Sequence, residues 1–177
     1  STSVSHAAGA HDHDGAALYA RYCALCHGEN REGYAADHAP SLRSPELMGS
    51  ATGSYLWLSI SYGRPGTAMA AFEDTQGGPL SHDAQHALVD WLMEESGVEQ
   101  NPIEDTVVVG DPILGAELYG THCASCHGTR GEGGTGTALA NPVFLATASD
   151  AFIRHTIVVG RSDTPMPAFS EVLTESE

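Results

Sequence analysis

The chain has 177 residues, enough for one medium-sized domain or two small ones. It carries 23 acidic residues against seven basic ones, all of them arginine, and its net charge is −16. This charge argues against nucleic acid and an anionic membrane surface as partners, because both would repel the protein. The acidity either only keeps the protein soluble or steers a basic partner towards it. No apolar run approaches the length of a membrane-spanning helix.

The N-terminal residues 1–13 carry His6, His11 and His13 among alanine, glycine and aspartate. These histidines could bind a metal ion, but the composition favours a disordered, solvated tail. The chain begins at Ser1 with neither an initiator methionine nor a signal-peptide pattern. We therefore expect that any signal sequence has already been removed.

A long repeat organises the rest of the chain. The segment 15–28, GAALYARYCALCHG, returns at 115–128 as GAELYGTHCASCHG. Further along, the segment 63–72 returns at 160–169, with a glycine–arginine pair and a methionine in the same places. An ordered series of such matches indicates a duplicated domain.

We call residues 14–97 the first repeat and residues 111–177 the second repeat, and expect each to be a domain. Residues 98–110 are the expected linker, with Asn101-Pro102 as a turn signal.

Each repeat is predicted to open with a helix. Asp14 suits the N-cap of the first one, and Asp111-Pro112 starts the second with proline near the first helical position. Further helices are predicted over 54–61, over 151–158 and from Ser81 to about Glu95. No segment alternates as a strand would, so the predicted fold class is all-α.

The second repeat stops before a counterpart of the helix predicted from Ser81. Thr174-x-x-Glu177 has the pattern of a capping box, which announces a helix. We therefore expect that the second repeat lacks its C-terminal helix in this sequence, and that the natural chain continues past Glu177.

The four cysteines of the chain form two Cys-x-x-Cys-His motifs at equivalent places of the repeats. Such a motif is typical of covalent haem attachment. The two thiols lie close enough to add to the two vinyl groups of one haem, and the histidine supplies the proximal iron ligand. The predicted attachment residues are Cys23, Cys26, His27, Cys123, Cys126 and His127.

A Cys-x-x-Cys pair has two other common uses, and the sequence disfavours both. A zinc site usually has a second pair of ligands nearby, whereas these pairs stand far apart, each inside its own repeat. A redox dithiol of the thioredoxin kind belongs in a βαβ setting, and no strand is predicted.

Two methionines are predicted to supply the sixth iron ligands. Met69 and Met166 sit in equivalent glycine- and proline-containing loops, and a thioether ligand raises the reduction potential of a haem. Met48 and Met93 are interpreted as core residues instead. The remaining histidines are interpreted as surface residues, although His38 could compete for a haem iron; they are His38, His82, His86, His122 and His155.

From about Asp14 to Glu177, the motifs together resemble a tandem pair of class I cytochromes c. In that family the haem motif closes the first helix, and a loop such as Ala39–Leu42 then passes the haem edge. The axial methionine follows a glycine-rich turn, and a final helix packs across the first. The resemblance implies two domains of this fold, the second without its last helix, each around one covalently bound haem c.

The resemblance implies an electron carrier rather than an enzyme, in the periplasm or otherwise outside the cytoplasm, where haem is attached after export. Its partners would be a redox donor and acceptor, or a larger membrane complex. The family's usual docking face is rich in lysine, and this chain has no lysine. The alternative is a di-haem oxidoreductase, of the peroxidase or thiosulfate-oxidising type, with one exchangeable haem ligand.

Overall fold

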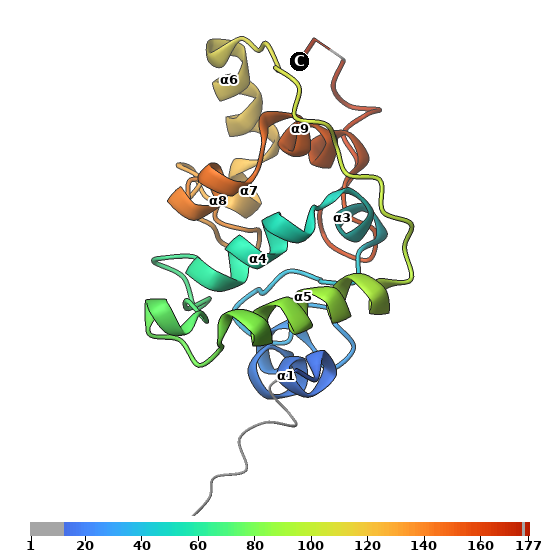
Figure 1. The fold of residues 1–177 in the computed structure, drawn as a ribbon. Helices are drawn as coiled ribbons and strands as arrows, with labels where there is room; N and C mark the ends of the chain where they lie inside the picture. The colour runs from blue at the N-terminus through green and yellow to red at the C-terminus, as the bar shows by residue number, and fades with distance from the viewer. Residues whose placement is uncertain (1–12, 175) are drawn as a thin grey trace, which may run out of the picture.

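The computed structural model describes residues 13–174 and 176–177. The regular secondary structure of the described residues is helical, apart from one isolated bridge between Glu73 and Leu80, so the all-α prediction is confirmed. The helices of Figure 1 are α1 (Gly15–Tyr22), α2 (Ala24–His27), α3 (Pro45–Ser50), α4 (Gly53–Tyr62), η1 (Asp74–Gln76), α5 (His82–Ser96), α6 (Pro112–His122), α7 (Ala124–His127), α8 (Pro142–Thr147) and α9 (Asp150–Val159). The predicted tail over 1–13, with His6 and His11, lies outside the described residues except for His13.

The predicted helices begin at the capping residues that the sequence offers. Asp14 Oδ1 accepts a hydrogen bond from Ala17 N at 3.2 Å, and Asp111 Oδ1 accepts one from Ile113 N at 2.8 Å. Ser81 Oγ accepts one from Ala84 N at 3.3 Å at the start of α5. These bonds satisfy backbone N–H groups that have no partner inside the helix, which fixes where each helix starts.

The core of the first repeat lies where α5 packs against α1 and α4 (Figure 1). Leu88 of α5 is fully buried, and Leu18 of α1 is nearly so. The rings of Tyr19 and Trp91 lie 5.2 Å apart at this contact. Met48 is also fully buried, and Met93 packs against the same cluster, so the core interpretation of both methionines is confirmed.

The second repeat begins in the same way, but its first helix is more open. No residue of α6 is buried, and Leu114, Leu118 and Tyr119 are only half-buried. Among the described residues, no helix follows α9 and none packs across α6 as α5 packs across α1. The predicted capping box forms in part, because the Glu177 carboxylate accepts hydrogen bonds from the backbone N and the hydroxyl of Thr174.

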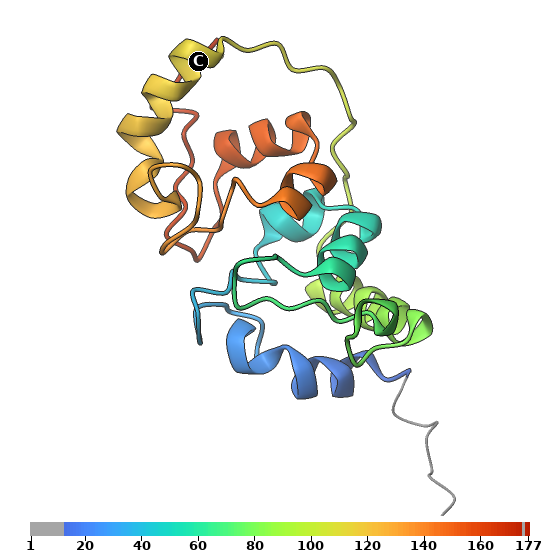
Figure 2. The ribbon, with the colours of Figure 1, turned by 90° about the vertical axis from the view of Figure 1, so that its left-hand side faces the viewer.

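The two repeats pack on one another through their middle helices. In both ribbon views α8 lies beside α4, and α9 lies beside α3 (Figures 1 and 2). The rings of Tyr55 and Phe152, which occupy equivalent places in α4 and α9, lie 5.0 Å apart across this interface. The repeats therefore meet through matching surfaces.

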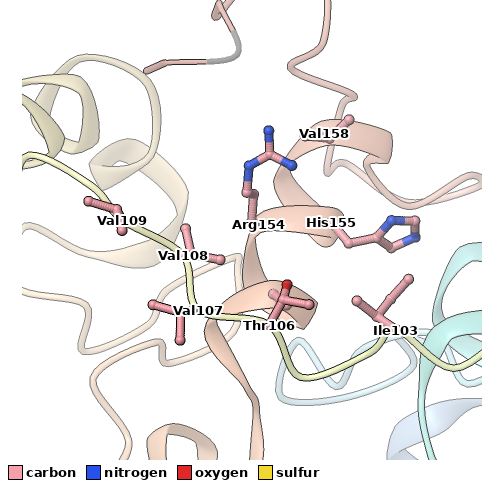
Figure 3. Close-up of a pocket in the computed structure, with 9 residues that line it drawn as sticks. Ile103, Thr106, Val107, Val108, Val109, Arg154, His155 and Val158 are labelled. Carbon is pink, nitrogen blue, oxygen red and sulfur yellow. The ribbon is translucent and has the colours of Figure 1, made fainter.

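The segment between the repeats, residues 98–110, runs along one side of the molecule from α5 to α6 (Figure 1). Asn101 N donates to Gly49 O at 2.8 Å, which ties this segment to the end of α3. Where the segment passes α9 it borders a cavity of about 470 Å³, whose lining includes Val108 and His155 (Figure 3). None of the helices in the described ranges has the length and apolar content of a membrane span.

A carboxylate of the first repeat is bound by the second. Glu46, in the first turn of α3, accepts a hydrogen bond from Ser162 N at 2.9 Å and another from the Ser162 hydroxyl. Ser44 Oγ donates to the same carboxylate at 2.7 Å. Burial alone would raise the pKa of Glu46, but the bonds from Ser162 and Ser44 outweigh it and lower the pKa to about 2.

This contact predicts a pH dependence of stability. A carboxyl whose pKa is lowered by folding stabilises fully above its ordinary pKa of 4.5, and that contribution is lost as the pH falls towards about 2. We expect the wild type to be more stable than Glu46→Gln at neutral pH, and the gap to narrow over this window. Urea unfolding at a series of pH values measures the gap.

Glu117→Gln is the matched control for this experiment, because Glu117 is exposed on α6. The control variant should follow the wild type throughout the same pH range. A constant gap between the wild type and Glu46→Gln down to the lowest pH would contradict the prediction.

Candidate functional site

The cysteine motif of each repeat lies at a break between two helices. α1 ends before Cys23 and α2 continues from Ala24 to His27, while α6 and α7 flank Cys123 in the same way. Cys26 N and His27 N both donate to Cys23 O, at 3.1 and 2.9 Å. This single turn holds both thiols and the imidazole close together in sequence order. All four cysteines are free thiols.

Both predicted proximal histidines are oriented by a backbone carbonyl. His27 Nδ1 lies 2.8 Å from Pro40 O, and His127 Nδ1 lies 2.7 Å from Thr137 O. A carbonyl only accepts, so Nδ1 donates, and in the neutral imidazole Nε2 then keeps its lone pair. This arrangement is the usual one for an imidazole that ligates a metal through Nε2.

The burial of the first histidine favours the form that iron requires. His27 is 7% exposed, and burial lowers its pKa, although the hydrogen bond to Pro40 opposes this effect. A neutral imidazole is the ligating form. Pro40 lies in the loop that sequence analysis expected beside the haem edge, and its role as an acceptor adds a reason for that loop's position.

A tyrosine braces the turn after each histidine. Tyr19 Oη donates to Gly28 O at 2.7 Å, and Tyr119 Oη donates to Gly128 O at 2.6 Å. Both glycines have a positive φ, of 85° and 83°, which a residue with a side chain rarely adopts. Sequence analysis did not single out these tyrosines, although both stand in the quoted repeat.

The residues present fit a covalently attached haem. Each repeat offers two free thiols and an imidazole whose Nδ1 is engaged by a backbone carbonyl, which leaves Nε2 as the nitrogen that can ligate iron. A Cβ at Gly136 would lie 2.8 Å from the His127 ring, so only a residue without a side chain lets this loop approach the ring so closely. The donor set therefore has the composition that a haem needs, and it is present twice.

The same features disfavour the two alternative uses of the cysteines. In both ribbon views α1 and α6 lie at opposite ends of the molecule, so the two pairs do not meet around one zinc ion (Figures 1 and 2). Burial and the neighbouring Cys26 raise the pKa of Cys23 to about 12. A redox dithiol needs a lowered thiol pKa instead.

The loop that carries Met69 is closed on itself. Arg64 N donates to Met69 O at 2.7 Å, Thr67 Oγ1 donates to Arg64 O at 2.8 Å, and Met69 N donates to Thr67 Oγ1 at 3.2 Å. Met69 is half-buried and packs against the core cluster. Three hydrogen bonds thus fix the backbone on both sides of the methionine.

The loop of Met166 repeats this geometry. Arg161 N donates to Met166 O at 3.0 Å, Thr164 Oγ1 donates to Arg161 O at 2.8 Å, and Met166 N donates to Thr164 Oγ1 at 3.1 Å. Sequence analysis missed the two threonines, although they occupy equivalent places in the repeats. Their role was invisible because the bonds are to the backbone.

The structure brings each methionine loop towards the cysteine motif of its own repeat. Tyr22 precedes Cys23, and its ring lies 6.4 Å from that of Phe72 at the end of the Met69 loop. His122 precedes Cys123, and its ring lies 6.0 Å from that of Phe169 at the end of the Met166 loop. Ligation of iron by the methionines remains a prediction that these contacts support.

The remaining histidines differ in their exposure. His38, His82 and His86 are exposed, as expected of surface residues, while His122 and His155 are half-buried. Among the described residues, no three side chains of the types His, Cys, Asp and Glu gather where they could hold a metal ion.

Comparison with known proteins places the chain among cytochromes. The cytochrome bc1 complex cytochrome c subunit of Mycobacterium tuberculosis is 28% identical over 164 residues, which are 88% of this chain and 55% of that protein. The subunit of the same name in Mycobacterium leprae is 26% identical over 165 residues, 89% of this chain and 54% of that protein. The chain thus spans little more than half the length of these relatives.

A solved structure and a family pattern complete the comparison. The reducing HAO-like protein complex of Kuenenia stuttgartiensis matches with a TM-score of 0.48 and 20% identity, over 92% of this chain and 90% of that one. The pattern of the family described as cytochrome c oxidase, cbb3-type, subunit III matches residues 10–92 and 111–177, and each stretch holds one Cys-x-x-Cys-His motif. The expected resemblance to tandem cytochromes c is confirmed, and the chain belongs to the family of the cytochrome c oxidase, cbb3-type, subunit III.

Proposed function

We propose that this protein transfers electrons through two covalently bound c-type haems, one in each repeat. The observation that carries the proposal is the hydrogen bond from each motif histidine to a backbone carbonyl, repeated at 2.8 and 2.7 Å. It leaves both Nε2 atoms ready for iron, beside two free thiols. The attachment residues are Cys23, Cys26, His27, Cys123, Cys126 and His127.

The proposed axial ligands are His27 and Met69 for the first haem and His127 and Met166 for the second. A haem bound in this way supplies a one-electron couple at its iron. The protein contributes the imidazole orientation, a thioether ligand that favours the reduced state, and partial burial of the site. We take residues 14–97 and 111–177 as the two domains and residues 98–110 as their linker.

We further propose that the protein works outside the cytoplasm as part of a larger membrane complex. The relatives are named as subunits of a cytochrome bc1 complex, which supports a fixed redox donor and acceptor as partners. A net charge of −16 without any lysine suits a basic partner surface. In this proposal the protein is an electron carrier rather than an enzyme.

A second candidate function is a di-haem oxidoreductase with one exchangeable ligand. The greater openness of the second repeat favours it: His127 is half-buried where His27 is buried, and α6 buries no residue. A redox titration followed by visible absorption separates the candidates. Two low-spin haems whose ferric forms both show the methionine band, before reduction and again after reoxidation, support the carrier. A ferric band that is missing at one haem, or that one haem fails to regain after reduction and reoxidation, supports the enzyme.

The haem count tests the proposal directly. We expect the intact mass of the purified holoprotein to exceed that of the polypeptide by two haems. The double variant Cys123→Ala/Cys126→Ala should carry one covalent haem, and so should Cys23→Ala/Cys26→Ala, because each motif serves its own haem. Pyridine haemochrome spectra of the same samples give an independent count. A wild type with a single covalent haem would refute the proposal for one repeat.

A further inference from the structure

Each methionine loop is hydrogen-bonded to a side chain of the other repeat. Asn141 of the second repeat donates from Nδ2 to Pro65 O at 2.9 Å, and Pro65 lies in the Met69 loop. Glu46 of the first repeat accepts from Ser162 N at 2.9 Å and from the Ser162 hydroxyl, and Ser162 lies in the Met166 loop. Both contacts therefore cross the interface between the repeats.

The two contacts are related by the repeat. Pro65 and Ser162 follow the arginine of equivalent Gly-Arg pairs, so they occupy the same place in the two loops. The residues that bond to the loops lie at the N-termini of the equivalent helices α3 and α8. Glu46 lies in the first turn of α3, and Asn141 is the N-cap of α8. The exchange is thus reciprocal, and the Tyr55–Phe152 ring contact crosses the same interface.

The side chains of Asn141 and Glu46 are themselves fixed by further hydrogen bonds. Asn141 is 5% exposed, and its Oδ1 accepts from the backbone N of Val143 at 3.1 Å while its Nδ2 reaches Pro65. Ser44 Oγ donates to the Glu46 carboxylate at 2.7 Å, to the same Oε2 atom that accepts from Ser162 N. A fixed donor or acceptor transmits position, which a freely rotating surface side chain does not.

Both methionine loops are short and are closed by internal hydrogen bonds. Backbone hydrogen bonds join Arg64 to Met69 and Arg161 to Met166, and a threonine hydroxyl bonds inside each loop. A displacement of Pro65 or Ser162 therefore moves the methionine, because the loop offers few internal rotations to absorb it. The hydrogen bond from the other repeat thus acts on the methionine through the loop backbone.

We propose that each repeat positions the axial methionine of the other: Glu46 of the first repeat holds Met166 in place, and Asn141 of the second repeat holds Met69. This inference rests on the proposed function, since it takes both methionines as iron ligands. Separation of the repeats then loosens the sixth ligand of both haems at once. Glu46 and Asn141 are positioning residues, because neither touches a ligand atom.

The test is a crossed set of variants of the holoprotein, read by the weak charge-transfer band of methionine-ligated ferric haem and by imidazole binding. In a Met69→Ala background the remaining band belongs to the second haem, and in a Met166→Ala background it belongs to the first. Glu46→Ala should weaken the band and raise imidazole affinity by about tenfold in the Met69→Ala background only. Asn141→Asp should have the same effects, by up to about tenfold, in the Met166→Ala background only.

The choice of substitutions separates positioning from folding. Asn141→Asp keeps an N-cap for α8 but has no N–H to donate to Pro65. Glu46→Gln keeps one acceptor oxygen, so its effect should lie between those of the wild type and Glu46→Ala. Glu117→Gln, on exposed α6, controls for the loss of one negative charge and should leave both bands unchanged. Far-UV circular dichroism confirms that each variant is folded.

The outcomes divide clearly. A wild type without any methionine band refutes the ligand assignment of the proposed function and takes this inference with it. If the wild type shows the band for both haems, a fall confined to the opposite repeat supports the inference. A fall in the variant's own repeat, an equal fall in both, or no fall at all overturns the inference and leaves the ligand assignment standing.

Discussion

Replacing Gly15 with alanine is expected to lower the free energy of unfolding by about 1–3 kcal/mol, the usual cost of forcing extra volume into a packed contact. Gly15 is buried in the first turn of α1, where it faces Ala87 and Trp91 of α5. A Cβ at this position would lie 2.2 Å from Trp91 Cβ and 2.5 Å from Ala87 O. Neither of these atoms can move without moving α5, so the helices must separate. Urea unfolding of the holoprotein, followed by far-UV circular dichroism, measures the change.

The second repeat supplies a matched control for this variant. Gly115 is the counterpart of Gly15 in the repeated segment, but a Cβ there would meet nothing within 4 Å. Gly115→Ala should therefore stabilise α6 by up to about 1 kcal/mol, because alanine has the higher helix propensity. Equal effects of the two substitutions would contradict a tight α1–α5 contact.

The helices that sequence analysis found are those with signals at both their start and their surface. α1, α4, α5, α6 and α9 combine a capping side chain with apolar residues at helical spacing, and their observed starts lie close to the predicted ones. Both signals are local, so neither depends on knowing how distant segments pack.

Two short helices were missed for the same physical reason. α3 and α8 each last less than two turns, which is too short for an apolar period to be visible. Their N-caps were still present in the sequence as Ser44-Pro45 and Asn141-Pro142, the combination that favours a helix start. The oversight matters, because these two N-termini hold the opposite methionine loops.

The candidate site also contains one part that the sequence predicts and one part that it does not. Thiols, imidazoles and thioethers are side-chain chemistry, so the repeat alone was sufficient to predict them. The acceptors that orient the histidines are backbone carbonyls of Pro40 and Thr137, two residues with no side-chain chemistry in common. Their selection depends on loop conformation, and a sequence carries no residue-type signal for a carbonyl acceptor.

The interface between the repeats was least accessible from the sequence. Glu46 and Ser162 are 116 residues apart, and nothing in the surroundings of either marks it as part of a pair. An acidic residue in the first turn of a helix already has a local explanation in the helix dipole. Glu46 therefore has a local role that already accounts for it, so the sequence gives no sign of its contact with the other repeat.

Replacing Met69 or Met166 with alanine should lower one reduction potential each, by on the order of 0.1 V or more within the roughly 0.8 V range that axial ligands span. A thioether favours ferrous iron, so its loss favours the ferric state of the haem in that repeat. The two closed loops have the same hydrogen bonds, at 2.8 Å from each threonine hydroxyl to the arginine carbonyl, so both methionines are equally well placed to act. A spectroelectrochemical titration of the holoprotein resolves the two potentials.

Met48→Leu is the control for this experiment, because Met48 is fully buried in the core and its substitution should leave both potentials unchanged. The charge-transfer band of the ferric protein gives a second readout, and each single variant should remove part of it. Complete loss of the band in Met69→Ala alone would refute Met166 as a ligand. The double variant must lose the band entirely, since a band that survived both substitutions would have to come from a different sulfur, and Met93 would be the methionine left to test.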